Sequence, residues 1–302
     1  MTWLLVAILA YLFLAIVLLF DRYFLAGPLP SPKAYAFYVG ILGFFACFLI
    51  LPFGVNIPIF SVLLLGLIAG LVRIFAILFL SISISKEEVS RVVPAVGGLV
   101  PIFSFFLFLL FLPQTEILTL SQVVAFVLLI FGSILISLKK ISFESFSLNV
   151  LKYPLIAAFL LALSFFLTKT LFLKIDFLTG IFLILFGSSL GAIILLAFSS
   201  SRKDIFGQKL TRKISGLFLF AQALGGLGVI LQFYSIFLAK PFQVSLINAL
   251  EGIIYVFLLI FIYILSKWNP DLLKEEMRGA NFFQKILATL LIVMGLAILA
   301  FL

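Results

Sequence analysis

Long apolar runs, each bounded by polar or turn-forming residues, repeat along the whole chain. A bilayer core about 30 Å thick requires about 20 apolar residues per helix. Runs of roughly this length cover residues 2–20, 34–53, 57–85, 89–112, 118–138, 153–173, 177–199, 214–238, 242–266 and 282–302. None shows the two-residue alternation of barrel strands, so the pattern predicts ten transmembrane helices.

Composition supports this prediction. The chain is 65% hydrophobic and 10% charged, with a mean hydropathy of +1.41, whereas about 25% of residues are charged in an average globular protein. So few charges cannot cover a water-facing surface. The longest polar segments, 200–213 and 267–280, are too short to hold a soluble domain. We therefore expect an all-α polytopic membrane protein.

The residue inventory also excludes much chemistry. The chain has no histidine and a single cysteine, Cys47, so His-based catalysis, an internal disulfide and Cys- or His-rich metal sites are excluded. No segment resembles the phosphate-binding loop of ATPases. No basic stripe is interleaved with exposed aromatic residues, which argues against a nucleic-acid partner. We expect no enzymatic activity, no cofactor and no metal.

The basic residues predict an orientation. Sixteen of the 20 Lys and Arg fall in the odd-numbered loops or within four residues of them, while the even-numbered loops hold Lys174 and Lys240 and the termini hold none. Because basic loops stay on the cytoplasmic side, this bias places both termini outside. We expect an integral protein of a bacterial or archaeal plasma membrane.

A central basic loop divides the ten predicted spans into five and five. When the chain is shifted by 147 residues, Arg22 falls on Lys169 and Gly40 on Gly187. Since five is odd, the two halves would cross the membrane in opposite senses. Inverted repeats of this kind are frequent in transporters, with the substrate site between the repeats.

Several motifs resemble the EamA repeat of the drug/metabolite transporter superfamily. In the first half they are SRVVP at 90–94, LVPIF at 99–103, Glu116, Gln122 and Gly132; in the second they are VSLINAL at 244–250, Glu275 or Glu276, Gln284 and Gly295. The resemblance implies two inverted five-helix repeats, residues 1–140 and 151–302, around a central cavity. It also implies that the fifth and tenth helices lie at the periphery.

Two opposite charges lie near the middle of predicted spans, one in each half: Arg73 and Glu251. A charge at a helix centre costs about 2.5–3.5 kcal/mol on insertion scales and is seldom accidental. With the polar residues around them, these charges give six candidate substrate-binding residues: Arg73, Glu251, Asn248, Tyr255, Gln232 and Lys169. Arg73 would hold an anionic group, and Glu251 an amine or a proton.

Each assignment has an alternative. Arg73 and Glu251 would, in the simplest case, pair with each other and lock the helices together. Lys169, near a helix end, is expected either to extend its amine to the membrane surface or to contact the mouth of the substrate site.

The resulting hypothesis is a secondary transporter that moves a small organic metabolite, amino-acid-like or otherwise charged, by alternating access. The alternative is a flippase for a lipid or a lipid-linked sugar. Expected partners are the small-molecule substrate, membrane lipids, and a coupling proton or counter-substrate. Ten spans can enclose a cavity in a monomer, so no oligomer is required.

Overall fold

The structure is a computed structural model that describes residues 2–29, 31–86, 89–112, 119–137, 148–207, 211–254, 256–257, 260–261 and 280–300. Regular structure in these residues is helical, without a strand. The elements are α1 (Thr2–Ala26), α2 (Pro32–Ile50), η1 (Leu51–Phe53), α3 (Phe60–Lys86), α4 (Val89–Phe111), α5 (Leu120–Ser137), α6 (Leu148–Phe172), α7 (Phe177–Leu195), α8 (Ser199–Phe206), α9 (Arg212–Leu238), α10 (Gln243–Ala249), η3 (Leu250–Gly252) and α12 (Ala280–Ala300). The all-α class is confirmed.

In the described part of the chain, six segments are helical, long and apolar enough to cross a membrane. They lie in α1, α2, α3, α6, α7 and α9, and shorter apolar stretches occur in α4, α5 and α12. Large hydrophobic side chains such as Phe45, Phe53 and Phe60 are exposed on the helix surfaces. This exposure fits an integral membrane protein whose outer surface faces lipid. Ten spans remain a prediction.

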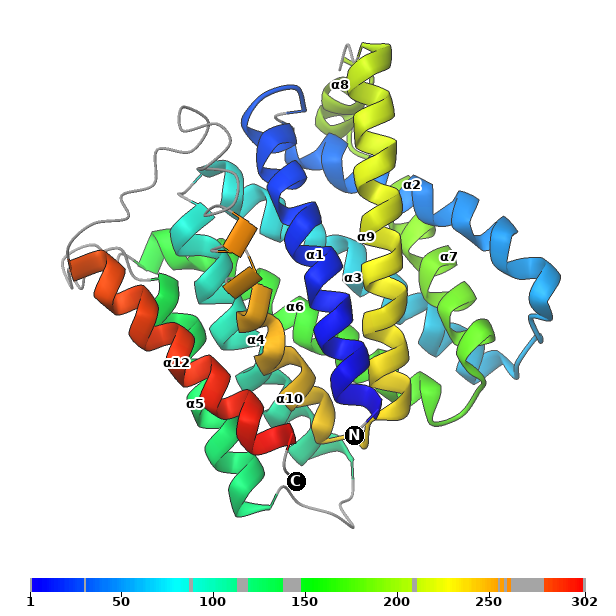
Figure 1. Cartoon of the computed structure of the whole chain (residues 1–302). Helices are drawn as coiled ribbons and strands as arrows, with labels where there is room; N and C mark the ends of the chain where they lie inside the picture. Colours follow the sequence, from blue (N-terminus) through cyan, green and yellow to red (C-terminus); the bar gives the residue numbers. More distant parts are fainter. Residues whose placement is uncertain are drawn as a thin grey trace.

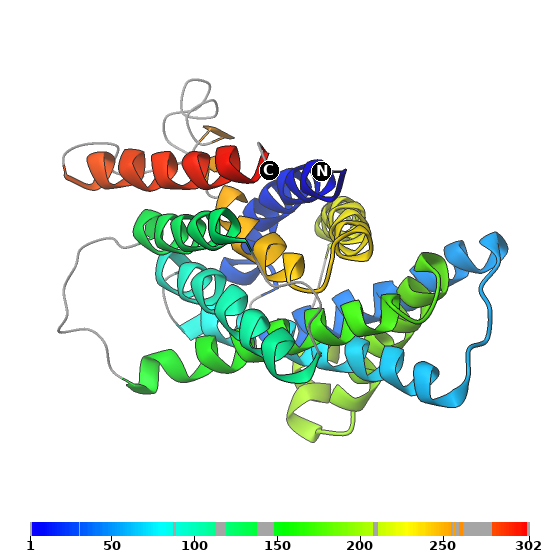
Figure 2. The same cartoon turned by 90° about the horizontal axis from the view of Figure 1, so that it is seen from below.

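The helices pair in a pattern that connects distant parts of the chain. α1 packs beside α9, α2 against α7 and α5 against α12 (Figures 1 and 2). α3 contacts both α6 and α7, and α4 contacts α6 and α10. The start of α1 and the end of α12 lie at one end of the bundle in Figure 1, and α8 lies at the other.

Glycine allows α3 and α7 to touch through their backbones. A Cβ added at Gly70 would collide with the Ile184 carbonyl oxygen and lie 2.6 Å from the Ser188 nitrogen. The Ser188 hydroxyl donates to the Gly70 carbonyl oxygen at 3.0 Å, and the Ser189 hydroxyl donates to that of Gly40 on α2 at 2.9 Å. These hydroxyls bond across helices where water is scarce.

Three elements differ from the sequence-based expectation. α1 does not end at residue 20 but continues to Ala26, so that Asp21 lies within the helix. The segment 200–213, expected to be a loop, contains the short helix α8. The span expected at 242–266 is not uniform, because α10 ends at Ala249 and gives way to the tighter turns of η3.

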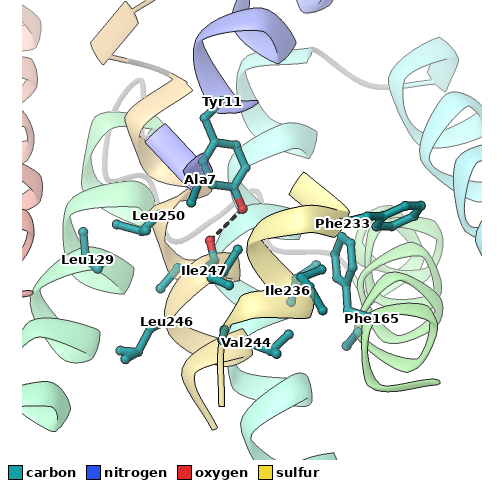
Figure 3. Packing of buried hydrophobic residues seen from close by; sticks show 14 of the residues in the cluster. Ala7, Tyr11, Leu129, Phe165, Phe233, Ile236, Val244, Leu246, Ile247 and Leu250 are labelled. Atoms are coloured by element: carbon teal, nitrogen blue, oxygen red, sulfur yellow. Dashed lines mark hydrogen bonds between the residues drawn. The ribbon is translucent and has the colours of Figure 1, made fainter. Parts of the chain in front are cut away.

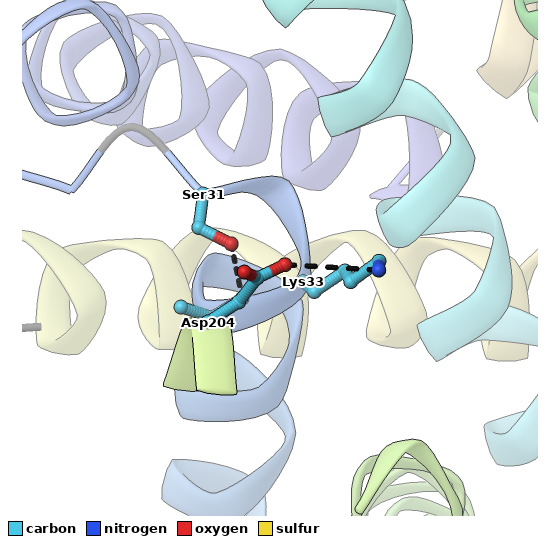
Figure 4. Close-up of polar contacts among 4 residues, drawn as sticks. Ser31, Lys33 and Asp204 are labelled. Atoms are coloured by element: carbon cyan, nitrogen blue, oxygen red, sulfur yellow. Dashed lines mark hydrogen bonds and ion pairs between the residues drawn. The ribbon is translucent and has the colours of Figure 1, made fainter. Parts of the chain in front are cut away.

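α8 is held against α2 by polar contacts, which the pattern of apolar runs does not reveal. Lys33 and Asp204 form an ion pair at 3.6 Å (Figure 4). The Tyr38 hydroxyl donates to the Ile205 carbonyl oxygen at 3.0 Å. The Ile205 side chain is buried among Phe24, Tyr35 and others. α8 is thereby fixed to the bundle.

α7 begins at a capped turn, at the end of the helix away from α8. The Asp176 side chain accepts a hydrogen bond from the Thr179 backbone N–H at 2.9 Å, the usual arrangement for an N-cap residue. Partial burial alone would raise the pKa of the Asp176 carboxyl, but hydrogen bonds, chiefly from Thr179, outweigh it and lower the pKa. The turn between α6 and α7 is therefore fixed by an ionised carboxylate.

Candidate functional site

Arg73 lies at the middle of α3, as expected, and its side chain is half-buried. The guanidinium carbon stands 5.7 Å from the centre of the Phe233 ring on α9, within the range of a cation–π contact. Arg73 also lies close enough to Tyr35 on α2 for the two groups to interact electrostatically. Three helices thus surround one guanidinium group.

A carboxylate is held next to Tyr35. The Tyr35 hydroxyl donates to Asp21 Oδ1 on α1 at 2.6 Å, and Gln222 Nε2 on α9 donates to the Tyr35 hydroxyl oxygen at 3.4 Å. The Gln222 side chain also hydrogen-bonds Asp21. We call Asp21, Tyr35 and Gln222 the Asp21 cluster. It ties α1, α2 and α9 together through side chains.

A second group of polar side chains also joins α1 and α9, at another position along these two helices. The buried Tyr11 hydroxyl donates to the Ile247 carbonyl oxygen on α10 at 2.6 Å (Figure 3). Gln232 Nε2 on α9 donates to the Tyr11 hydroxyl oxygen at 3.4 Å, and Glu251 on η3 interacts electrostatically with Tyr11. We call Tyr11, Gln232 and Glu251 the Tyr11 cluster. It brings together two of the six predicted site residues, Gln232 and Glu251.

The two clusters are spaced along an antiparallel pair of helices. Tyr11 on α1 meets Gln232 on α9, and Asp21, ten residues later, meets Gln222, ten residues earlier. At 1.5 Å per residue the clusters are about 15 Å apart along the helices. Arg73 contacts Phe233, the neighbour of Gln232, and interacts with Tyr35 of the Asp21 cluster. It therefore connects the two levels.

Asn248 is fully buried one turn before Glu251. Its Nδ2 donates to the Ser104 hydroxyl oxygen on α4 at 2.9 Å, whereas its Oδ1 has no hydrogen-bond partner among the described residues. The Ser245 hydroxyl, one turn earlier on α10, is likewise buried and unpartnered. These oxygens lie where α10 gives way to η3, and a change of helical pitch often marks a functional segment.

Arg73 and Glu251 do not pair. Among the described residues the ion pair is Lys33–Asp204, and neither Arg73 nor Glu251 has an oppositely charged group within salt-bridge distance. The alternative in which these two charges simply lock the helices is therefore absent from the structure. The Arg73 charge, partly removed from water, is left available for an anionic group.

Lys169 has a different environment from the one expected. Its amine donates to the Ile236 and Phe237 carbonyl oxygens, each at 3.2 Å, in the last turn of α9. The residue is 3% exposed, so the amine is directed into the bundle and not out of it. It satisfies carbonyls that the end of a helix leaves unpaired. Tyr255, the remaining predicted site residue, lies outside the described residues.

Sequence reasoning missed Asp21, Tyr11 and Tyr35. Asp21 was assigned to a loop because the apolar run stops at residue 20, and the two tyrosines resembled ordinary span residues. One signal was present: Gln222 and Gln232 fall on the small, polar face of α9, and each receives one of the missed groups. A polar face on one helix predicts polar partners on its neighbours.

Comparison with known proteins shows the fold and nothing finer. No protein-family model and no curated protein matches this chain. A solved structure described only as "Crystal structure of protein" superposes on 98% of this chain and 94% of its own length, with a TM-score of 0.65 and 18% sequence identity. A shared fold does not fix function. The chain is therefore an all-α protein with a helical arrangement seen before, and its EamA membership stays a prediction.

Proposed function

We propose that this chain is a secondary transporter of the EamA type that moves a small charged organic solute by alternating access. The observation that carries the proposal is Arg73: a half-buried guanidinium at the middle of an apolar helix, stacked on Phe233 and without an ion-pair partner among the residues that the structure describes. Ionisable groups at such depth mark solute or ion pathways more often than structural contacts. The bound group would be a carboxylate or a phosphate.

Ten spans arranged as inverted repeats, 1–140 and 151–302, are part of the proposal. If the second repeat follows the order of the first, α6, α7, α9 and α12 correspond to α1, α2, α3 and α5. The observed contact of α3 with α6 then corresponds to that of α1 with α9. α2 with α7, and α5 with α12, would pair across the symmetry axis. These pairings support the repeat.

The contact between α5 and α12 supports it in more detail. Residues 125–132 and 288–295 share the pattern A-x-x-x-[L/I]-x-x-G. A Cβ at Gly132 would lie 3.0 Å from the Ala288 carbonyl oxygen, and a Cβ at Gly295 would lie 3.1 Å from that of Ala125. Equivalent atoms thus meet in an antiparallel pair. A twofold axis in the membrane plane would produce this geometry.

The second half contributes the other charged group of the proposed site. Glu251 is half-buried at η3, where α10 loses its regular pitch, and it interacts electrostatically with Tyr11, to which Gln232 donates a hydrogen bond. Discontinuous helices at the repeat interface commonly provide backbone and side-chain groups for solute or ions. Glu251 would bind an amine or carry the coupling proton, with Asn248 presenting its unpartnered Oδ1 nearby.

Transport by reconstituted protein tests this function. The protein would be reconstituted into liposomes, and uptake of a labelled amino-acid mixture would be measured for wild type, Arg73→Gln and Glu251→Gln. A charged hydrogen bond contributes about 1.5–3 kcal/mol, and 1.4 kcal/mol is tenfold in affinity. We expect Arg73→Gln to reduce uptake at low substrate concentration at least tenfold. Glu251→Gln should abolish uptake or its response to an imposed pH gradient.

Arg202→Gln, on the exposed face of α8, is the matched control for loss of a positive charge, and it should transport like wild type. All variants must elute as monodisperse protein in detergent. If wild type takes up no amino acid, the amino-acid proposal is wrong and the flippase alternative should be tested with labelled lipid. If both charge variants transport normally, the midplane site is wrong.

A further inference from the structure

Asp21 is a carboxylate inside an apolar helix, and the hydrogen-bond donors that it has among the described side chains are neutral. The Tyr35 hydroxyl donates to Oδ1 at 2.6 Å, and the Gln222 amide provides a second hydrogen bond. An ionised carboxylate offers about four acceptor positions, so these two donors leave acceptor capacity unused. Asp21 is half-buried. Its charge is thus partly removed from water without a full set of partners.

No positive group of the described structure neutralises Asp21. Lys33, near the start of α2, forms its ion pair with Asp204, and Lys169 bonds the end of α9. Arg73 interacts with Tyr35, but its guanidinium group does not lie within ion-pair distance of Asp21. A charge desolvated without a counter-ion is costly, so such a group is expected to meet a cation during function.

Tyr35 interacts with two groups of opposite charge, Asp21 and Arg73, and neither has an ion pair within the described part of the chain. It hydrogen-bonds Asp21 from one side and interacts electrostatically with Arg73. The surroundings are aromatic: the Phe218 ring packs edge-on against Tyr35 at 6.1 Å, and Phe233 lies under the guanidinium. An opposite-charge pair beside apolar walls fits a solute that carries a cationic and an anionic group on an apolar body.

We propose that Asp21 binds the ammonium group of a zwitterionic solute whose carboxylate is bound by Arg73. This inference deepens the proposed function and rests on it, since it names the second charged anchor of the same site. Asp21 takes the role for which the sequence suggested Glu251. Glu251 interacts with Tyr11, about 15 Å along α1 from Asp21, and is left for the coupling proton.

Three probes that share one apolar body separate the two anchors: L-leucine, 3-methylbutylamine, which lacks the carboxylate, and 4-methylpentanoate, which lacks the amine. The readout is the rise in Tm of the purified full-length protein with each probe. We expect all three probes to stabilise wild type, L-leucine most. Asp21→Asn should lose at least tenfold in apparent affinity for the amine and for leucine while keeping its response to the acid.

Arg73→Gln should show the opposite pattern, losing the acid and keeping the amine. Asn can still accept from Tyr35 and Gln222, so Asp21→Asn removes charge with little change in shape. Tyr35→Phe keeps the carboxylate and should retain the amine response within a few fold. Asp204→Asn, a carboxylate on α8 outside the site, should respond like wild type to all three probes.

The outcomes distinguish the assignment of Asp21 as the ammonium site from the proposed transport function. A normal amine response in Asp21→Asn, combined with its loss in Glu251→Gln, would overturn the assignment of Asp21 and leave the transporter proposal intact. An Asp21→Asn protein that binds leucine normally but no longer responds to a pH gradient would make Asp21 the proton site instead. Wild type that neither binds nor transports leucine would overturn the zwitterion and with it the proposed substrate class.

Discussion

Polar side chains inside this bundle mostly satisfy carbonyl groups of neighbouring helices. Ser164 donates to the Ala69 carbonyl oxygen at 3.2 Å, and Ser235 donates to that of Trp3 at 2.9 Å. Lys169 does the same with a charged donor. In an apolar surrounding an unsatisfied carbonyl is expensive, so these contacts specify which helices are neighbours. Asp21 and Arg73 differ because their charges are not used in this way.

Lys169 allows a test of whether a buried charge stabilises the protein by bonding carbonyl groups of a neighbouring helix. Replacing it with Met keeps the apolar stem and removes the amine from two carbonyls at the end of α9. Loss of hydrogen bonds from a charged donor costs about 1–3 kcal/mol. We expect Lys169→Met to lower the Tm in detergent by several degrees, whereas Lys174→Met, at an exposed position, should leave it unchanged. An unaltered Tm in Lys169→Met would remove the capping role.

At the scale of elements, helix pairs are selected by where glycine permits contact. The α5–α12 pair is the simplest case. Gly132 on α5 allows the backbone of α12 to come close, and Gly295 on α12 does the same for α5 at the equivalent position. A Cβ at Gly132 would lie 2.7 Å from Ile292 Cγ1 and 3.1 Å from the Ile292 nitrogen. The backbone atom cannot yield, so the two helices would have to separate.

We therefore expect Gly132→Ala to destabilise the protein by about 1–3 kcal/mol, the usual cost of overpacking, seen as a lower Tm. Gly226→Ala is the matched comparison, since a Cβ there meets nothing within 4 Å. Alanine favours a helix over glycine by about 1 kcal/mol, so this variant should be neutral or more stable. Equal Tm values for the two variants would show that the α5–α12 contact is looser than described.

The sequence predicts helices well and their interruptions poorly. Apolar runs located the helices because lipid imposes a minimum length on each of them. The same rule ended the first span at residue 20, although Tyr35 and Gln222 stabilise Asp21 inside α1. α8 and the change of pitch at η3 likewise depend on contacts between distant segments. Arg73 and Glu251 were found as deep charges, but their failure to pair could not be read from spacing.

At the scale of the whole molecule, the two ends of the bundle differ in charge. α8 lies at one end and contains Arg202 and Lys203, while the turn between α6 and α7 lies at the other end of α7. The basic end should face the cytoplasm. The start of α1 and the end of α12 lie together at the opposite end (Figure 1), which agrees with termini on one side.

Cysteine labelling tests this orientation directly. Cys47 is the single cysteine, so Cys47→Ala provides a background for Lys174→Cys, in the α6–α7 turn, and Arg202→Cys, on α8. In intact cells we expect a membrane-impermeant maleimide to label Lys174→Cys and spare Arg202→Cys until the cells are opened. The reverse pattern would place the termini inside, and labelling of both before lysis would point to leaky cells rather than to either orientation.

The pairing of α1 with α9 and of α5 with α12 also governs how the protein is made. Synthesis adds about 5–20 residues per second, so Asp21 is translated on the order of 10–40 s before Gln222. During that interval its carboxylate lacks one of its two donors. Until the second half is made, α1 lacks the side chains of α9 that contact its polar groups. A ribosome that stalls in the second half leaves behind a fragment whose polar groups face lipid, which membrane proteases can recognise.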